Sequence, residues 1–167
     1  MAMAPKTAVD LFTRPGVSLE CRFMDPLYDP VKKVANHLGI DMNADLGQPI
    51  ISHIAGKLIN IIAPWTEEEC VIIRGETACY LFGHIRSSLT LGGDLSVKVG
   101  TEIGRIIPYP ASRPHLHFGV NRMGFIIIDR PSGWGWGRCP FSATKLQVFA
   151  RGWDDPENHL RSFASGR

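Results

Sequence analysis

The 167-residue sequence lacks the features that mark several common protein classes. No run of apolar residues approaches the roughly 20 that a membrane span needs, so we expect no such span. No Lys/Arg cluster stands out and the formal net charge is only +2, which disfavours a dedicated nucleic-acid binder. The opening residues, MAMAPKTAVDLF, contain no apolar core of a signal peptide, and we therefore expect none.

Several chemical motifs are also missing. There is no G-x-S-x-G elbow, no P-loop, no GxGxxG after a strand and no HExxH. The four cysteines form no CxxC pair, which makes a cysteine-based zinc site unexpected. Cys70 and Cys79 could face each other across a hairpin, but our expectation is four reduced, mostly buried thiols. The carboxylates of residues 67–69 and 154–155 are expected to be solvated.

Short apolar runs separated by Gly, Pro and Asp breaks predict strands along most of the chain. They are QPIISHIAG (48–56), GKLINIIAP (56–64), ECVIIRG (69–75), ACYLFGHI (78–85), EIGRIIP (102–108), HLHFGV (115–120) and GFIIID (124–129). Helix is scarce. Residues 29–38 suggest one short, turn-rich segment, and residues 142–152 a helix capped by Ser142 and closed by Gly152. The fold class is therefore mainly β, one antiparallel domain over residues 19–167 with a short C-terminal helix, after a loosely attached lead-in of residues 1–18.

The stretch PHLHFGV, residues 114–120, alternates as a half-buried strand does. Its larger apolar residues fall on one face, and His115 and His117 fall on the other, roughly 7 Å apart. Two such imidazoles can share a metal ion, or one can bind the metal while the other handles its water. The alternative is two solvent-facing histidines.

Two further histidines stand in suggestive places. His37 precedes Asp41 by four residues, and Gly39 between them lets the backbone curl so that both side chains can reach one ion. His, a carboxylate and a distant His form a standard catalytic zinc set with an open position for water. The alternative is an Asp41 salt bridge to a partly exposed His37. His84 ends an apolar strand, and taken alone it would be a structural histidine.

Together these three clusters resemble the lysostaphin/LytM-like family of zinc endopeptidases, which cut peptidoglycan cross-bridges. The family pattern is H-x3-D, then a histidine closing a mid-chain strand, then H-x-H in a PHLHF context. The matching segments are NHLGIDMNADLGQPIISHIAGKLI (36–59), YLFGHI (80–85), VKVGTEIGRI (97–106) and RPHLHFGV (113–120). The resemblance spans roughly residues 19–160. It implies the family's antiparallel β fold, of the duplicated hybrid motif type, with a groove.

Carried over position by position, the resemblance implies one Zn²⁺ per chain with His37, Asp41 and His117 as ligands. His84 and His115 would be the non-ligand catalytic pair. The chain departs from the family pattern at Gly119, where an acidic residue is usual, at Arg113, where Gly is common, and at Cys21 or its neighbour, where Gly is usual. None of these departures removes a predicted ligand or base.

The implied function is zinc-dependent hydrolysis of peptide cross-links in bacterial peptidoglycan, with peptide stems as the partner. One alternative is a non-catalytic peptidoglycan-binding or hydrolase-activator module of the same fold. Another is a metallopeptidase for other peptides. We expect a monomer that acts at the bacterial cell wall or periplasm, delivered by a phage or exported without a signal peptide. Trp134 and Trp136 either pack in the core or line the groove as a sugar-stacking platform.

Overall fold

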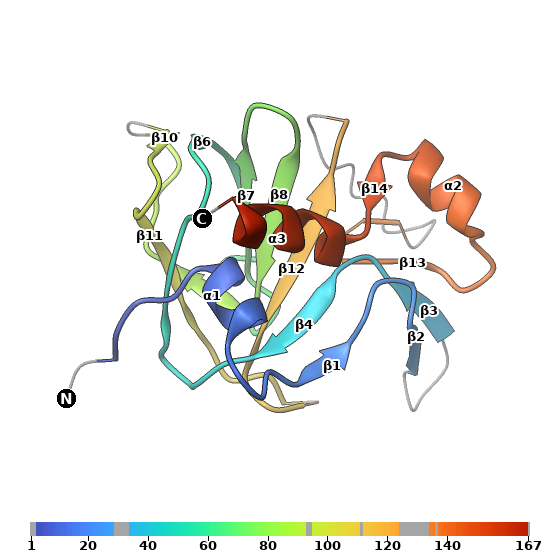
Figure 1. The fold of residues 1–167 in the computed structure, drawn as a ribbon, viewed down its shortest axis with the longest axis horizontal. Coiled ribbons are helices and arrows are strands. Elements are labelled where there is room, and N and C mark those ends of the chain that lie inside the picture. The colour runs from blue at the N-terminus through green and yellow to red at the C-terminus, as the bar shows by residue number, and fades with distance from the viewer. Residues whose placement is uncertain are drawn as a thin grey trace.

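A large antiparallel sheet organises the computed structural model, which describes residues 3–28, 34–92, 95–110, 112–123, 134–135 and 137–166. Its main path runs β1-β4-β12-β8-β7-β6-β10, with β14 paired to β12 (Figure 1). The bounds are β1 Leu19–Cys21, β4 Ile40–Asn43, β12 His115–Asn121, β8 Cys79–Gly83, β7 Cys70–Arg74, β6 Gly56–Ile62, β10 Ser96–Val97 and β14 Trp153–Asp154. The predicted mainly antiparallel β fold is confirmed.

Two three-stranded sheets complete the β structure. One has the order β5-β11-β9, with bounds Pro49–Ile51, Glu102–Ile106 and Ile85–Ser87. The other has the order β13-β3-β2, with bounds Arg138–Pro140, Val34–His37 and Pro26–Tyr28. The described part of the turn-rich segment predicted at residues 29–38 is thus largely strand β3. The GFIIID run lies outside the described residues.

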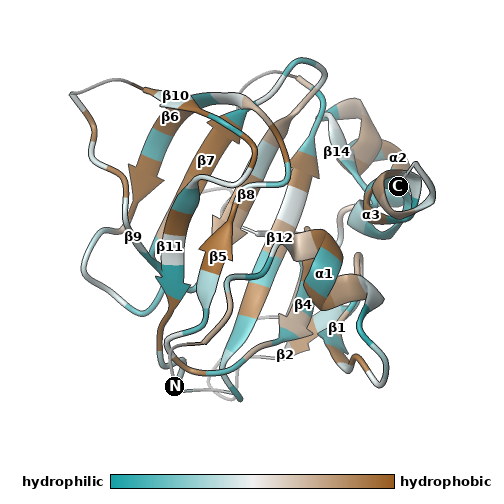
Figure 2. Cartoon of the chain, turned by 60° about the vertical axis from the view of Figure 1, so that its left-hand side comes forward, coloured by the Kyte–Doolittle hydropathy of each residue, from teal (hydrophilic) through white to brown (hydrophobic). Residues whose placement is uncertain are grey.

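The central sheet buries apolar side chains on both faces. Along β12, Leu116, Phe118 and Val120 join the larger cluster, which also contains residues of β4, β7 and β8. A smaller cluster lies on the other face, and it includes Leu38, Leu81 and residues of the C-terminal region. Figure 2 shows the apolar bands that run along these central strands. Because side chains alternate along each strand, His115 and His117 lie on the same face as this smaller cluster.

Helix α1, Ala8–Thr13, corrects the expectation of a loosely attached lead-in. Thr7 and Asp10 form a capping box at its start, and its apolar residues Ala8, Val9, Leu11 and Phe12 are buried. It packs beside α3, Pro156–Ser165, on one face of the sheet (Figure 1). The apolar stripe of this short segment is therefore part of the main core, which a composition-based view of residues 1–18 overlooked.

The C-terminal region contains two helices where one was expected. Helix α2 covers Lys145–Ala150 and is capped by Thr144, not Ser142, because Gln147 completes a capping box with Thr144. Gly152 follows with φ +82°, as predicted for the residue that closes this helix. Helix α3 is capped by Asp155, whose side chain accepts from the backbone N–H of Glu157. Asp155 is therefore a cap and not merely solvated.

The cysteines and the surface charges have simple arrangements. None of the four cysteines is in a disulfide, and three are buried, as expected. Cys70 and Cys79 do not face each other, because β7 pairs with β8 so that Cys70 lies opposite Gly83 and Cys79 opposite Arg74.

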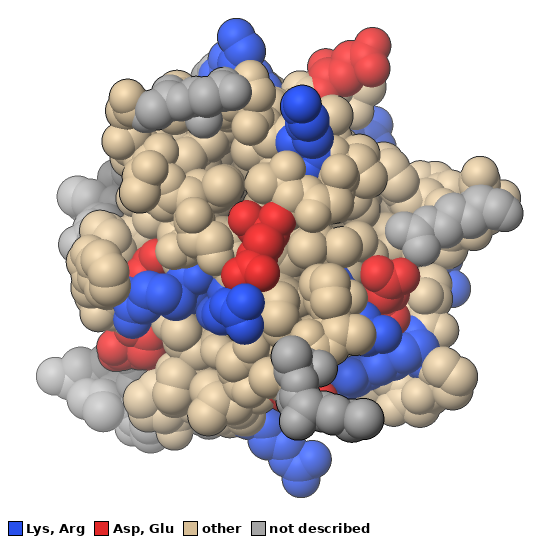
Figure 3. Space-filling view, turned by 90° about the vertical axis from the view of Figure 1, so that its left-hand side faces the viewer, with Lys and Arg blue, Asp and Glu red and all other residues tan. Residues whose placement is uncertain are grey.

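On the face in Figure 3, acidic and basic side chains are interspersed, so this face carries no field of one sign. None of the described helices is long and apolar enough to cross a bilayer.

Candidate active site

Three neighbouring backbone segments bring His37, Asp41 and His117 together. A bend at residues 38–39 separates His37, the last residue of β3, from β4, so the chain folds back between His37 and Asp41. Strand β12 pairs with β4 so that His117 stands directly opposite Asp41. Directly opposed residues of an antiparallel pair share a face, which places both side chains on the same side of the sheet.

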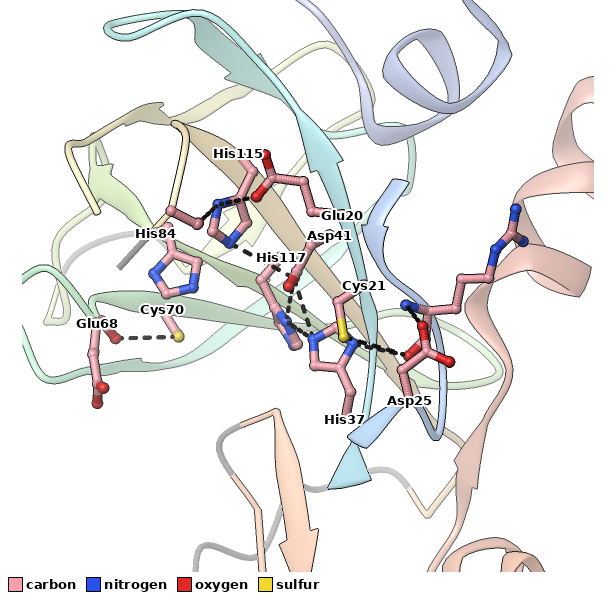
Figure 4. A network of polar contacts seen from close by, with 12 residues as sticks. Glu20, Cys21, Asp25, His37, Asp41, Glu68, Cys70, His84, His115 and His117 are labelled. Carbon is pink, nitrogen blue, oxygen red and sulfur yellow. Dashed lines mark hydrogen bonds and ion pairs between the residues drawn. The ribbon is translucent and has the colours of Figure 1, made fainter. Parts of the chain in front are cut away.

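The three side chains offer donor atoms at the corners of a small triangle (Figure 4). His37 Nε2 lies 2.8 Å from His117 Nδ1 and 3.2 Å from Asp41 Oδ1, and His117 Nδ1 lies 3.0 Å from Asp41 Oδ1. Ligand atoms bound to tetrahedral zinc at 2.0–2.1 Å are about 3.3 Å apart. The triangle therefore fits one face of a zinc tetrahedron, and two imidazoles with one carboxylate are donors that Zn²⁺ takes.

The backbone orients the two imidazoles of this triangle differently. His37 Nδ1 lies 3.2 Å from the Arg22 carbonyl, so that Nδ1–H donates and Nε2 keeps its lone pair for a metal. The His117 ring lies edge-on against Gly39 and Gly137, where an added Cβ would come within 2.5 Å and 2.6 Å of the ring. The His117 ring fits between these two residues only because both are glycines, since a Cβ at either position would clash with the ring.

The electrostatics of the triangle favour a cation. Burial alone would lower the pKa of His37, but the Asp41 carboxylate overcomes this and raises that pKa to about 10. Burial alone would raise the pKa of Asp41, but His37 and His117 hold it well below its usual range. A proton thus binds tightly at the position between the donor atoms. A metal ion there must displace that proton, so we expect metal affinity to fall at low pH.

His84 and His115 lie beside the triangle. Their ring centroids are 4.6 Å apart, and the His84 centroid is 6.3 Å from that of His117. His115 Nδ1 donates to the Arg113 carbonyl at 2.7 Å, and His84 Nδ1 donates to the Glu67 carbonyl at 2.9 Å. Each ring therefore keeps its Nε2 available for other contacts. For His115 this atom lies 3.8 Å from Asp41 Oδ1, which places it at the edge of the triangle.

His84 is held in an unusual state. Its φ is +58°, a left-handed conformation that is costly for a residue other than glycine and that concentrates at functional sites. Burial, together with the neighbouring His115, lowers the pKa of His84 to about 4. The imidazole is therefore neutral at pH 7 and can accept a proton. The Tyr109 ring lies against it, tilted by 41°, with the two ring centroids 4.2 Å apart.

The buried carboxylate of Glu69 holds the segment that supports His84. Its Oε2 accepts from the Trp65 backbone N–H at 2.7 Å and from Arg86 at 2.5 Å, and its Oε1 accepts from the Ser87 backbone N–H at 2.7 Å. Glu69 is only 2% exposed, so the expectation of a solvated carboxylate was wrong here. The contacts fasten the loop that carries the Glu67 carbonyl to strand β9, directly after His84.

The model of peptidase family M23 matches residues 35–127, which is more than half of the chain. The chain belongs to peptidase family M23. This match contains all five candidate residues. No curated protein matches the sequence.

Solved structures share the fold at low sequence identity. The catalytic domain of the antimicrobial peptidase lysostaphin from Staphylococcus simulans aligns over 87% of this chain and 91% of its own, with 18% identity and a TM-score of 0.54. LytU aligns over 90% of this chain and 88% of its own, with 17% identity and a TM-score of 0.59. A zinc-containing peptidase from Vibrio cholerae aligns over 62% of this chain and 32% of its own, with 24% identity and a TM-score of 0.51.

The structure thus brings together all five residues proposed for this M23 site. Sequence reasoning missed Glu69, and it noted Cys21 only as a departure from the family pattern. Trp134 packs against the smaller core cluster and stacks under the Arg151 guanidinium, 4.2 Å from its ring centre, which favours the core alternative for this residue. Trp136 lies outside the described residues.

Proposed function

We propose that this M23 peptidase is a zinc-dependent endopeptidase that hydrolyses peptide cross-links of bacterial peptidoglycan. The observation that carries the proposal is the triangle of donor atoms of His37, Asp41 and His117, with edges of 2.8–3.2 Å. Two further histidines with fixed tautomers flank it. A non-catalytic module would not require all five groups in one place, so their convergence favours an enzyme.

When bound, Zn²⁺ supplies a Lewis acid that polarises the scissile carbonyl and lowers the pKa of water toward about 7. The protein handles the protons. One of His84 and His115 accepts a proton from the attacking water at its Nε2, and later delivers a proton to the leaving amine. The other, in its protonated form, donates a hydrogen bond from Nε2–H to the negative oxygen that develops on the carbonyl. The backbone carbonyls of Glu67 and Arg113 keep both rings in the required orientation.

The test pairs a zinc measurement on the purified protein with mass analysis of the peptides released from purified sacculi. We expect one zinc per chain and release of peptides whose new ends identify the cleaved bond. Binding to sacculi without release would support the non-catalytic alternative. Cleavage of an unrelated peptide, with sacculi left intact, would support a metallopeptidase with a different substrate.

The place of action follows from the substrate. Peptidoglycan lies outside the bacterial inner membrane, so the proposed enzyme acts at the cell wall or in the periplasm. Delivery by a phage and export across the inner membrane are both compatible with this place of action. A monomer is sufficient for this chemistry, because all five proposed groups come from one chain.

A further inference from the structure

The thiol of Cys21 lies at the candidate metal site and has no part in the mechanism proposed above. Its Sγ and one donor atom each of His37 and Asp41 all lie within 4.8 Å of one another. Figure 4 shows the sulfur beside the His37 ring. Cys21 is half-buried and is not in a disulfide. Thiolate is a strong zinc ligand with a bond of about 2.3 Å, so this residue is a candidate donor beside His37 and Asp41.

Strand pairing explains why Cys21 faces the site. Strand β1 pairs with β4 so that Leu19 is opposite Met42 and Cys21 is opposite Asp41, with a bulge between the two pairs. In a regular strand Cys21 would share the face of Leu19, which packs against the main core. The additional residue in the bulge turns Cys21 to the other face. Bulges that redirect a side chain in this way occur often beside active sites.

The pairing also extends the site into a row across three strands. Cys21 of β1 is paired with Asp41 of β4, and Asp41 is paired with His117 of β12 on its other side. Residues paired in this way share one face of the sheet. Asp41 therefore has a candidate ligand on each side. His37 approaches the same row from β3, within hydrogen-bond distance of Asp41 and His117.

From this arrangement we propose that Cys21 is a displaceable fourth ligand of the metal held by His37, Asp41 and His117. The inference rests on the proposed zinc site. A sulfur ligand and a nitrogen ligand of tetrahedral zinc are about 3.6 Å apart. The Sγ atom already lies within 4.8 Å of donor atoms of His37 and Asp41, so in this proposal a rotation of the Cys21 side chain toward the ion completes the coordination. With four protein ligands the site is closed, and the position for water is filled. With the thiol turned away the site is open and competent for hydrolysis.

The two states give the enzyme a resting form whose population depends on the thiol. The fraction of open sites limits the apparent activity of the wild-type protein. A change that removes the thiol from the site should therefore raise the turnover of zinc-loaded protein. The expected increase is the reciprocal of the fraction of wild-type sites that are open. The same change should weaken metal binding, because one of four ligands is lost.

Cobalt substitution tests the coordination directly. The wild-type protein is loaded with Co²⁺, and its absorption is compared with that of Cys21→Ser and Cys70→Ser. A thiolate bound to Co²⁺ gives a charge-transfer band in the near ultraviolet. We expect this band in the wild type, its loss in Cys21→Ser, and its retention in Cys70→Ser. Cys70 is the matched control because it occupies the same row, but beyond Gly83.

Zinc affinity and turnover supply the second readout. Cys21→Ser should weaken zinc binding by at least the roughly 10–100-fold typical of losing a residue that only supports a ligand. At saturating zinc it should release peptides from sacculi faster than the wild type. Cobalt bound without a thiolate band in the wild type would overturn the inference about Cys21 and leave the proposed metal site standing. If neither Co²⁺ nor Zn²⁺ binds, both proposals fail.

Discussion

The two faces of the central sheet treat their histidines in opposite ways. On one face His37, His115 and His117 lie within 3.8 Å of the Asp41 carboxylate, and His84 lies next to His115. All of these histidines except His117 donate Nδ1–H to backbone carbonyls. On the other face His53 and His159 lie among aromatic rings, with the His53 centroid 5.4 Å from Phe118 and 5.2 Å from Phe163. The same residue type meets a carboxylate and carbonyl acceptors on one face and packs among aromatic rings on the other.

The difference shows how the surroundings of a buried histidine determine its charge and its orientation. Burial alone lowers the pKa of an imidazole, as it does for His159, where the pKa falls to about 4. A neighbouring carboxylate reverses this effect at His37 and creates a position that attracts a cation. Carbonyl acceptors then determine which nitrogen faces that position. Four predictions, from the largest effect to the smallest, test this contrast.

The largest effect is expected from the triangle. His37→Ala, Asp41→Ala and His117→Ala should each lose both zinc and hydrolysis of sacculi, because three protein ligands are the minimum for a catalytic zinc site. Zinc content and peptide release measure the two losses. His159→Ala is the matched control from the opposite face and should keep both. If His159→Ala lost zinc as His117→Ala does, the result would contradict the inference that only the face with Asp41 holds the metal.

Next are the two flanking histidines. His84→Ala and His115→Ala should each reduce turnover by about a hundred- to ten-thousandfold, the usual contribution of a proton-handling group. Both variants should keep most of their zinc, because neither side chain belongs to the triangle. Steady-state release assays at saturating zinc, alongside metal analysis, separate these outcomes. Full turnover by His84→Ala would remove it from the catalytic pair.

A smaller effect is expected at Glu69, which positions the support of His84 without touching it. Glu69→Gln weakens the contacts to Arg86 and the backbone, and the displacement of His84 should lower kcat by up to about a hundredfold. KM and zinc content should change little. Glu102→Gln is the control, since Glu102 also pairs with an arginine, Arg105, but on the exposed surface. Equal losses in the two variants would contradict a positioning role for Glu69.

The smallest effect concerns acid stability. The pKa of His159 is about 4 in the folded protein and 6.5 as its ordinary value, so the unfolded chain binds more protons between these limits. The contribution of His159 to the free energy of unfolding is therefore fully present above pH 6.5, and it is lost as the pH decreases toward 4. His159→Phe should flatten this part of the stability profile. Thermal unfolding with a chelator present, from pH 4 to 7, measures the difference from the wild type, and parallel profiles would refute it.

Local patterns made the family and much of the site readable in advance. The alternation of PHLHFGV predicted strand β12 with its two histidines on one face. The structure has this strand, and Leu116, Phe118 and Val120 join the main core on its other face, but all seven residues of β12 are buried and not only one face. The His37–Gly39–Asp41 spacing predicted a bend, which the structure has at residues 38–39. Both features depend on residues close together in sequence, and the periodicity of a strand or the freedom of a glycine is visible there.

The sequence by itself determined the residue types of the site and the strands that carry them, because periodicity and short spacings are local properties. Only the tertiary structure decided that Glu69 is an anchor and that the Cys21 thiol lies within 4.8 Å of donor atoms of His37 and Asp41. Those facts depend on contacts between Glu69 and strand β9 and on a bulge between β1 and β4. Pairing register and burial arise between segments distant in sequence, where no local pattern reports them.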